Sequence, residues 1–123
     1  MFNRTNCAPE SPTDLVPLNS SSSQFPVVFT WTTGFDTEDN EDTAYDAKRD
    51  YFCIGTNESD PCTNANNTDS KSIADDNRIS LDSSVLADNG TYYWAMRTDD
   101  GFLNSSWKIF VVTVNVTDII VVL

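Results

Sequence analysis

The residues best suited to binding a metal ion gather in one acidic segment, residues 36–42. Oxygen-bearing side chains stand there at alternate positions: Asp36, Glu38 and Asn40. This is the spacing of the first half of a calcium-binding loop. The second half departs from the pattern, because Glu41 takes the place of the required glycine and Ala47 that of the bidentate glutamate. We expect a solvated acidic loop, with calcium as the alternative and no other metal or cofactor.

The three cysteines indicate an oxidising compartment. Eight residues rich in turn-forming types separate Cys53 from Cys62, so a disulfide between them closes a short loop and contributes about 2–3 kcal/mol. The alternative is two unrelated free thiols. Cys7 is left over, and an odd cysteine in an exported protein suggests an intermolecular bond or a partner elsewhere. Without a Cys-x-x-Cys pair or a histidine, a zinc site is not expected.

Acceptor triplets for asparagine-linked sugars are the most frequent modification signal in the chain. Seven Asn-x-Ser/Thr triplets occur, whereas its composition of 12 Asn, 13 Ser and 14 Thr yields about two or three by chance. They begin at Asn3, Asn19, Asn57, Asn66, Asn89, Asn104 and Asn115. Such triplets are used on exposed segments of exported proteins, so we expect an extracellular or cell-surface glycoprotein.

The sequence contains no arrangement of residues that is typical of catalysis. Histidine is absent, which removes the commonest general base and every histidine triad. There is no Gly-x-Ser-x-Gly elbow and no phosphate-binding loop. With 15 aspartates in the chain, two neighbouring carboxylates do not by themselves indicate an acid–base pair. We expect a protein that is not an enzyme.

Charge and length restrict the remaining functions. The net charge is −12, whereas nucleic-acid binders and proteins that dock on anionic lipid need a basic surface. The 123 residues, 39% of them hydrophobic, suffice for one domain with a modest core. The N-terminus lacks the apolar region of a signal peptide, and no apolar run is long enough to span a membrane. We therefore expect a processed chain or a module of a longer one, without membrane insertion.

The elements that must hold these residues are all predicted to be β-strands, because no window has a helical period. Alternating or β-rich runs predict strands at 27–32, 51–54, 78–81, 91–98 and 107–116. The last two strands are separated by a turn at 99–101. Prolines before residue 27 and the serine run 20–23 predict a linker that leads to a short edge strand. Three parts follow: an extended arm or linker, 1–13; a β-sandwich, 14–116; and an apolar strand, 117–123.

One stretch carries a more specific signal. The run Leu86-Ala87-Asp88-Asn89-Gly90-Thr91-Tyr92-Tyr93-Trp94 resembles the Asp-x-Gly-x-Tyr corner of immunoglobulin-like sandwiches. Together with Phe29-Thr30-Trp31 and Trp107, it resembles a fibronectin type III-like module of exported archaeal or bacterial surface glycoproteins. The resemblance covers residues 12–114 and implies a seven-stranded sandwich. Trp94 stands where immunoglobulin domains have their second core cysteine, so no inter-sheet disulfide is implied, and the Asn-rich segment 63–71 is longer than a typical loop.

Side-chain alternation along 91–98 predicts which residues enter the core. Inward positions are Tyr92, Trp94 and Met96, and outward positions are Tyr93, Ala95 and Arg97. The buried Tyr92 hydroxyl needs a partner, for which we expect a backbone carbonyl near Leu86. Gly90 permits the close approach. Trp31 is expected in the core, whereas Tyr93 and Trp107 are candidates to stack on a sugar.

Two functions remain open. The first is a structural module, a glycosylated subunit or repeat of a surface filament, sheath or stalk, which forms a homopolymer or tandem repeats. It depends on an apolar C-terminal segment: Ile119, Ile120, Val121, Val122 and Leu123. Such a strand is an aggregation hazard in water, so we expect it to pair head to tail with a neighbouring copy; its own sheet or a following repeat are the alternatives. The second function is a carbohydrate- or partner-binding adhesin module, which clustered exposed aromatics would favour.

Our first prediction concerns the sugars. Intact mass spectrometry of protein from its native source is expected to show a mass decrease on enzymatic deglycosylation, because most acceptor asparagines lie in polar loops. Peptide mapping then assigns the occupied sites. Asn115 alternates with Val114 and Val116, so its modification requires that this face be solvated. Unmodified peptides at all seven triplets would contradict the prediction.

Overall fold

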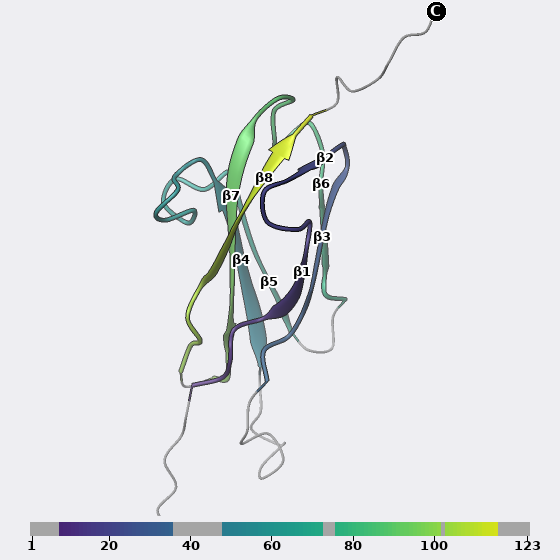
Figure 1. The fold of residues 1–123 in the computed structure, drawn as a ribbon. Helices are drawn as coiled ribbons and strands as arrows, with labels where there is room; N and C mark the ends of the chain where they lie inside the picture. The colour runs from purple at the N-terminus through teal and green to yellow at the C-terminus, as the bar shows by residue number, and fades with distance from the viewer. Residues whose placement is uncertain (1–7, 36–47, 73–75, 102, 116–123) are drawn as a thin grey trace, which may run out of the picture.

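The computed structural model describes residues 8–35, 48–72, 76–101 and 103–115, and every regular element in these residues is a β-strand. The strands are β1 (Thr13–Val16), β2 (Ser21–Ser23), β3 (Val27–Thr32), β4 (Arg49–Gly55), β5 (Asn67–Ser72), β6 (Arg78–Leu81), β7 (Thr91–Asp99) and β8 (Lys108–Val114). They form a three-stranded sheet of order β1-β3-β6 and a five-stranded sheet of order β2-β8-β7-β4-β5 (Figure 1). The fold is therefore all-β with two sheets, as in a β-sandwich.

The strands predicted from alternation are confirmed. In β3 the side chains of Val27, Phe29 and Trp31 are buried, while their neighbours are half-buried or exposed. Residues 78–81 coincide with β6, and residues 51–54 and 91–98 lie within β4 and β7. Apolar residues at every second position give each strand one face that must be covered, and the opposite sheet covers it.

The prediction of seven strands was wrong for the described residues, which contain eight. β2 lies in the serine run expected to be a linker, and β5 lies in the Asn-rich segment expected to be a loop. Both are edge strands: β2 pairs only with β8, in parallel, and β5 pairs only with β4. Backbone hydrogen bonds to one neighbour hold an edge strand, so its side chains need not alternate between apolar and polar.

Three aromatic rings join the two sheets. Phe29 of the three-stranded sheet lies with its ring centroid 5.1 Å from that of Phe52 and 4.9 Å from that of Trp94, both in the five-stranded sheet. The rings of Phe52 and Trp94 lie 6.0 Å apart. Tilted and edge-on contacts at these distances are the favourable geometries for aromatic pairs. All three side chains are fully buried, so this cluster is the centre of the core.

The start of β7 is held by the buried Tyr92. Its hydroxyl accepts a hydrogen bond from the backbone amide of Ala87 at 2.6 Å, rather than bonding the carbonyl that we expected. A hydroxyl can donate or accept a hydrogen bond, so the corner is closed with the Tyr92 hydroxyl as acceptor instead of donor. Gly90 lies so close that a Cβ there would stand 2.6 Å from the Tyr92 ring, which confirms the need for glycine.

The other end of β7 is held by a buried carboxylate. Asp50, at the start of β4, is 1% exposed. Its Oδ2 accepts hydrogen bonds from Trp31 Nε1 at 2.8 Å and Thr33 Oγ1 at 2.6 Å, and its Oδ1 accepts one from Thr98 Oγ1 at 2.6 Å. The Thr98 hydroxyl accepts in turn from the amide of Gly34 at 2.9 Å. Four hydrogen bonds therefore connect β4 and β7 with β3 and the residues that follow it.

Residues 10–12, directly before β1, pack against the sandwich. The amide of Glu10 donates a hydrogen bond to the carbonyl of Phe35 at 2.8 Å, and Pro12 is fully buried. The backbones approach so closely at Gly34 that a Cβ there would stand 1.7 Å from the Glu10 carbonyl oxygen. Glycine is required at this position because any side chain would collide with the Glu10 backbone.

Replacing Phe29 by alanine is expected to lower the free energy of unfolding by about 3–5 kcal/mol, because it leaves a cavity between the two sheets. Urea denaturation followed by tryptophan fluorescence measures the change. The control is Leu18→Ala, since Leu18 is 68% exposed and its loss is expected to change stability by less than about 0.5 kcal/mol. Equal effects of the two substitutions would contradict the assignment of the core.

Asp50→Asn is expected to cost about 1–3 kcal/mol, because the amide group cannot accept the hydrogen bonds that one carboxylate oxygen now accepts. The control is Glu58→Gln, which makes the same change of charge at an exposed position. The measurement is the urea midpoint of each variant at one pH. A midpoint for Asp50→Asn equal to that of the control would show that the buried carboxylate does not stabilise the fold.

Candidate functional site

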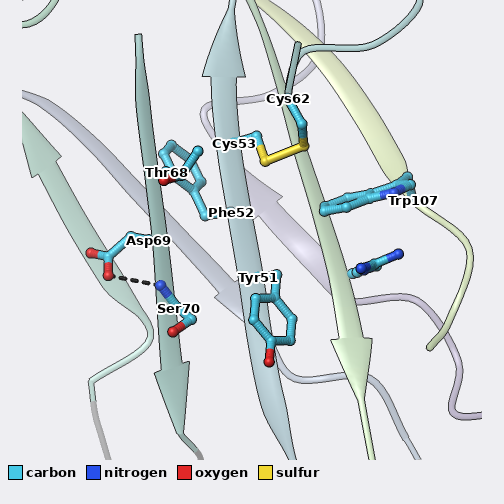
Figure 2. A pocket seen from close by; sticks show the side chains of 9 residues that line it. Tyr51, Phe52, Cys53, Cys62, Thr68, Asp69, Ser70 and Trp107 are labelled. Carbon is cyan, nitrogen blue, oxygen red and sulfur yellow. Dashed lines mark hydrogen bonds between the residues drawn. A yellow bond between two sulfur atoms is a disulfide. The ribbon is translucent and has the colours of Figure 1, made fainter. Parts of the chain in front are cut away.

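A groove of about 530 Å³ lies on the face of the five-stranded sheet that points away from the core (Figure 2). The lining residues are Tyr51, Phe52, Cys53, Cys62, Thr68, Asp69, Ser70, Arg97 and Trp107. Because Phe52 points into the core, its neighbours Tyr51 and Cys53 point outward from β4. Alternation along β4 therefore places these two side chains in the groove.

Strand register places three groove residues in one row. Tyr51 of β4 pairs with Arg97 of β7 on one side and with Ser70 of β5 on the other. Directly paired residues on one face have neighbouring side chains, so the row runs across three adjacent strands. Trp107, immediately before β8, completes the arrangement on the side of β7. The pairing of β4 with β5 and β7 therefore fixes the relative positions of the central groove residues.

The arginine lies over both aromatic rings. The guanidinium carbon of Arg97 is 4.4 Å from the ring centroid of Trp107 and 5.9 Å from that of Tyr51. Both distances are in the range of cation–π interactions, and these interactions hold the guanidinium within the groove. The buried Nε atom of Arg97 has no hydrogen-bond partner among the described residues. The ring contacts involve the π-faces, which do not satisfy its N–H donors.

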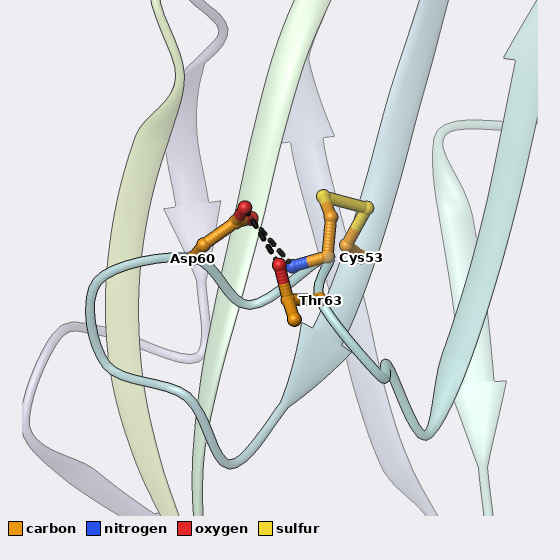
Figure 3. The surroundings of a disulfide bond; sticks show 4 residues. Cys53, Asp60 and Thr63 are labelled. Carbon is orange, nitrogen blue, oxygen red and sulfur yellow. Dashed lines mark hydrogen bonds between the residues drawn. A yellow bond between two sulfur atoms is a disulfide. The ribbon is translucent and has the colours of Figure 1, made fainter.

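The predicted disulfide is confirmed and forms part of the groove. Cys53 and Cys62 are bonded, with their Cα atoms 5.0 Å apart (Figure 3). Asp60 caps the turn next to the bond, accepting hydrogen bonds from the Cys62 amide at 3.1 Å and the Thr63 hydroxyl at 2.8 Å. Because Cys53 points outward from β4, the bond holds the connection between β4 and β5 against the outer face of the sheet.

This connection also covers Ala95, which was predicted to face outward. Ala95 pairs with Cys53 on the outer face but is only 1% exposed. A second groove of about 230 Å³ lies there, lined by Ser59, Asp60, Pro61, Cys62, Ala95, Trp107 and Ile109. Trp107 and Cys62 therefore line both grooves. Tyr93, the other candidate to stack on a sugar, is half-buried and lines neither.

Among the described residues that line the larger groove, Arg97 alone is basic, and no carboxylate lies on the same face of the sheet. Asp69 of β5 pairs with the core-facing Phe52, so its carboxylate points away from the groove, lies 3.9 Å from Lys71 and accepts a hydrogen bond from the Ser70 amide at 2.7 Å. Outside the groove, hydrogen bonds from the Ser84 hydroxyl and amide lower the pKa of Asp82, which caps the turn after β6. The groove is therefore a site of local positive charge in a chain of net charge −12.

The described acceptor asparagines lie in connections or directly after a strand. Asn19, Asn57, Asn66, Asn89 and Asn104 are exposed, and Asn115 is half-buried directly after β8. None of these six lines either groove. At Asn57 the side-chain oxygen accepts hydrogen bonds from the Ser59 amide at 3.1 Å and hydroxyl at 3.0 Å, while at Asn19 it accepts one from the Val111 amide at 2.9 Å. At both asparagines the side-chain oxygen makes these bonds. The side-chain nitrogen, to which a sugar is attached, takes no part in them.

Several predicted site residues lie outside the described residues. They are Asn3, Cys7, the calcium candidates Asp36, Glu38 and Asn40, and the assembly segment Ile119, Ile120, Val121, Val122 and Leu123. Among the residues that the structure describes, no group of three or more Cys, Asp or Glu side chains could hold a metal ion. No helix in this part of the chain could span a membrane.

The sequence identified Trp107 as a candidate for ligand contact but not Arg97 or Tyr51. Alternation did place Arg97 outward, yet an outward arginine on a strand is ordinarily a solvated residue. The missing information was register: only the pairing of β4 with β7 brings Tyr51 and Arg97 together. No protein-family model and no curated protein matches the chain.

Proposed function

We propose that the chain is a carbohydrate-binding module of an exported glycoprotein, and that it holds its ligand in the groove on the five-stranded sheet. The observation that carries this proposal is the position of Arg97 between Tyr51 and Trp107 in a groove of about 530 Å³. Small-molecule sites are concave, occupy about 300–1,000 Å³ and combine apolar rings with a few polar groups. The module has no enzymatic activity.

The lining suits a sugar in particular. Sugars present apolar C–H faces beside hydroxyl groups, and the groove presents the rings of Tyr51 and Trp107 beside the hydroxyl side chains of Thr68 and Ser70. Aromatic rings cover the apolar faces, while the hydroxyl side chains exchange hydrogen bonds with the sugar hydroxyls. A groove with both kinds of surface favours a sugar over a purely apolar ligand.

The placement of the acceptor asparagines favours binding over a structural role. A structural module can carry glycans on both of its faces, whereas a binding module needs one face bare. The six described acceptors lie in connections or directly after β8, and none lines the groove. A filament joined by residues 119–123 stays a prediction, because that segment lies outside the described residues.

The proposal includes a finer fold assignment. We place the chain among the immunoglobulin-like sandwiches, in which three strands of one sheet follow the order C-F-G and a tyrosine corner opens strand F. Here β4-β7-β8 have that order, and Tyr92 at the start of β7 bonds the amide of Ala87. The outer face of this sheet carries the groove. The disulfide between Cys53 and Cys62 is consistent with export.

Two tyrosines make a matched test of this function. Tyr51 and Tyr93 are both half-buried and outward-facing on adjacent strands, but only Tyr51 lines the groove. A fluorescent multivalent form of the protein is applied to an array of neutral and acidic glycans. We expect specific binding, a loss of at least about tenfold in affinity for Tyr51→Ala, and unchanged binding for Tyr93→Ala.

Thermal unfolding of both variants checks that the substitutions leave the fold intact. Absence of any specific glycan signal, or equal binding by Tyr51→Ala and Tyr93→Ala, would contradict the proposed function. Binding to a neutral glycan alone would support it.

A further inference from the structure

We infer that the groove selects a sugar that carries a single carboxylate, and that the guanidinium of Arg97 binds this group. The inference rests on the proposed carbohydrate-binding function and names the chemical class of its ligand.

Arg97 lacks an anionic partner among the described residues. Arg97 is half-buried, and its Nε has no hydrogen-bond partner among the described residues. Within the same part of the chain, no carboxylate lies within ion-pair distance of it. A partly desolvated cation without an anion is costly, and a ligand that supplies the anion removes that cost on binding.

The ring contacts of Arg97 do not use its hydrogen-bond donors. The guanidinium carbon lies over the faces of Trp107 and Tyr51, 4.4 and 5.9 Å from their ring centroids. The N–H bonds of a guanidinium lie in its plane, and with Nε buried a ligand meets the edge formed by the two Nη groups. A carboxylate approaches in that plane and accepts two parallel hydrogen bonds. The aromatic contacts therefore hold Arg97 in place without using the donors that a carboxylate needs.

The charge of the groove limits the charge of its ligand. Among the described residues that line the groove, Arg97 alone is basic, and no carboxylate shares its face of the sheet there. Polyanions such as sulfated polysaccharides gain affinity from several cations at once and are repelled by a chain of net charge −12. One arginine matches one carboxylate. The hydroxyls of Thr68 and Ser70 then face the uncharged remainder of the sugar.

The test compares acids with their uncharged amides. The probes are the methyl α-glycosides of N-acetylneuraminic acid and of glucuronic acid, and the corresponding carboxamides, which keep the shape and lose the charge. Titration calorimetry and saturation-transfer NMR measure binding to the intact protein. We expect at least one of the acids to bind, and its amide to bind at least about tenfold more weakly. This comparison uses the unmodified protein and does not depend on the folding of a variant.

Variants of two arginines locate the effect. Arg97→Lys keeps the charge but loses the planar fork, so we expect at least about tenfold weaker binding of the acid. Arg97→Gln is expected to bind the acid no better than its amide. The control is Arg78→Gln, because Arg78 is exposed on β6 in the other sheet. Its affinity for the acid is expected to equal that of the unmodified protein.

Three results would overturn the inference. They are equal affinity for acid and amide, undiminished acid binding by Arg97→Gln, and failure of both acids to bind. In the first two cases a loss of binding in Tyr51→Ala would still support the carbohydrate-binding groove. The two proposals therefore fail separately.

Discussion

The packing of Phe29 against Phe52 and Trp94 fixes the orientation of the other side chains on the two central strands. Successive side chains on a strand point to opposite faces, so burying Phe52 and Trp94 turns Tyr51 and Arg97 outward. A slip of one residue in either strand would exchange the two faces. The hydrophobic core and the groove are therefore two consequences of one pairing, that of β4 with β7.

Directional polar contacts at both ends of β7 complement this non-directional packing. At one end the amide of Ala87 donates to the Tyr92 hydroxyl, and at the other the Thr98 hydroxyl donates to the buried Asp50. Apolar burial supplies most of the driving force for folding but tolerates small displacements, whereas a buried carboxylate with three donors requires one geometry. Together they hold the strand that carries Arg97 in a single register.

Local patterns in the sequence predict the strands with one covered face, and the structure confirms them. Alternation at Val27, Phe29 and Trp31 is visible in any window of six residues, and so is the corner that leads to Tyr92. The spacing of Cys53 and Cys62 was sufficient to predict their bond. These features share one property, which is that all of the information lies within a few neighbouring residues.

The features that were not predicted depend on distant parts of the chain. β2 and β5 are polar edge strands, recognisable only once β8 and β4 are in place to pair with them. Asp50 looks like a surface residue until Trp31 and Thr98 surround it. The candidate site has the same character, because Tyr51 and Arg97 are 46 positions apart and meet only through strand register.

The strand order gives the two walls of the groove different mechanical properties. Arg97 lies on β7, which has β8 on one side and β4 on the other, whereas Thr68 and Ser70 lie on β5, which has a neighbour on one side only. A strand held on one side opens locally at a lower free energy than a central strand. The charged anchor is thus preorganised, while the hydroxyl-bearing wall can adjust its position. Strict recognition of one chemical group and tolerance toward the rest of the ligand come from different strands of the same sheet.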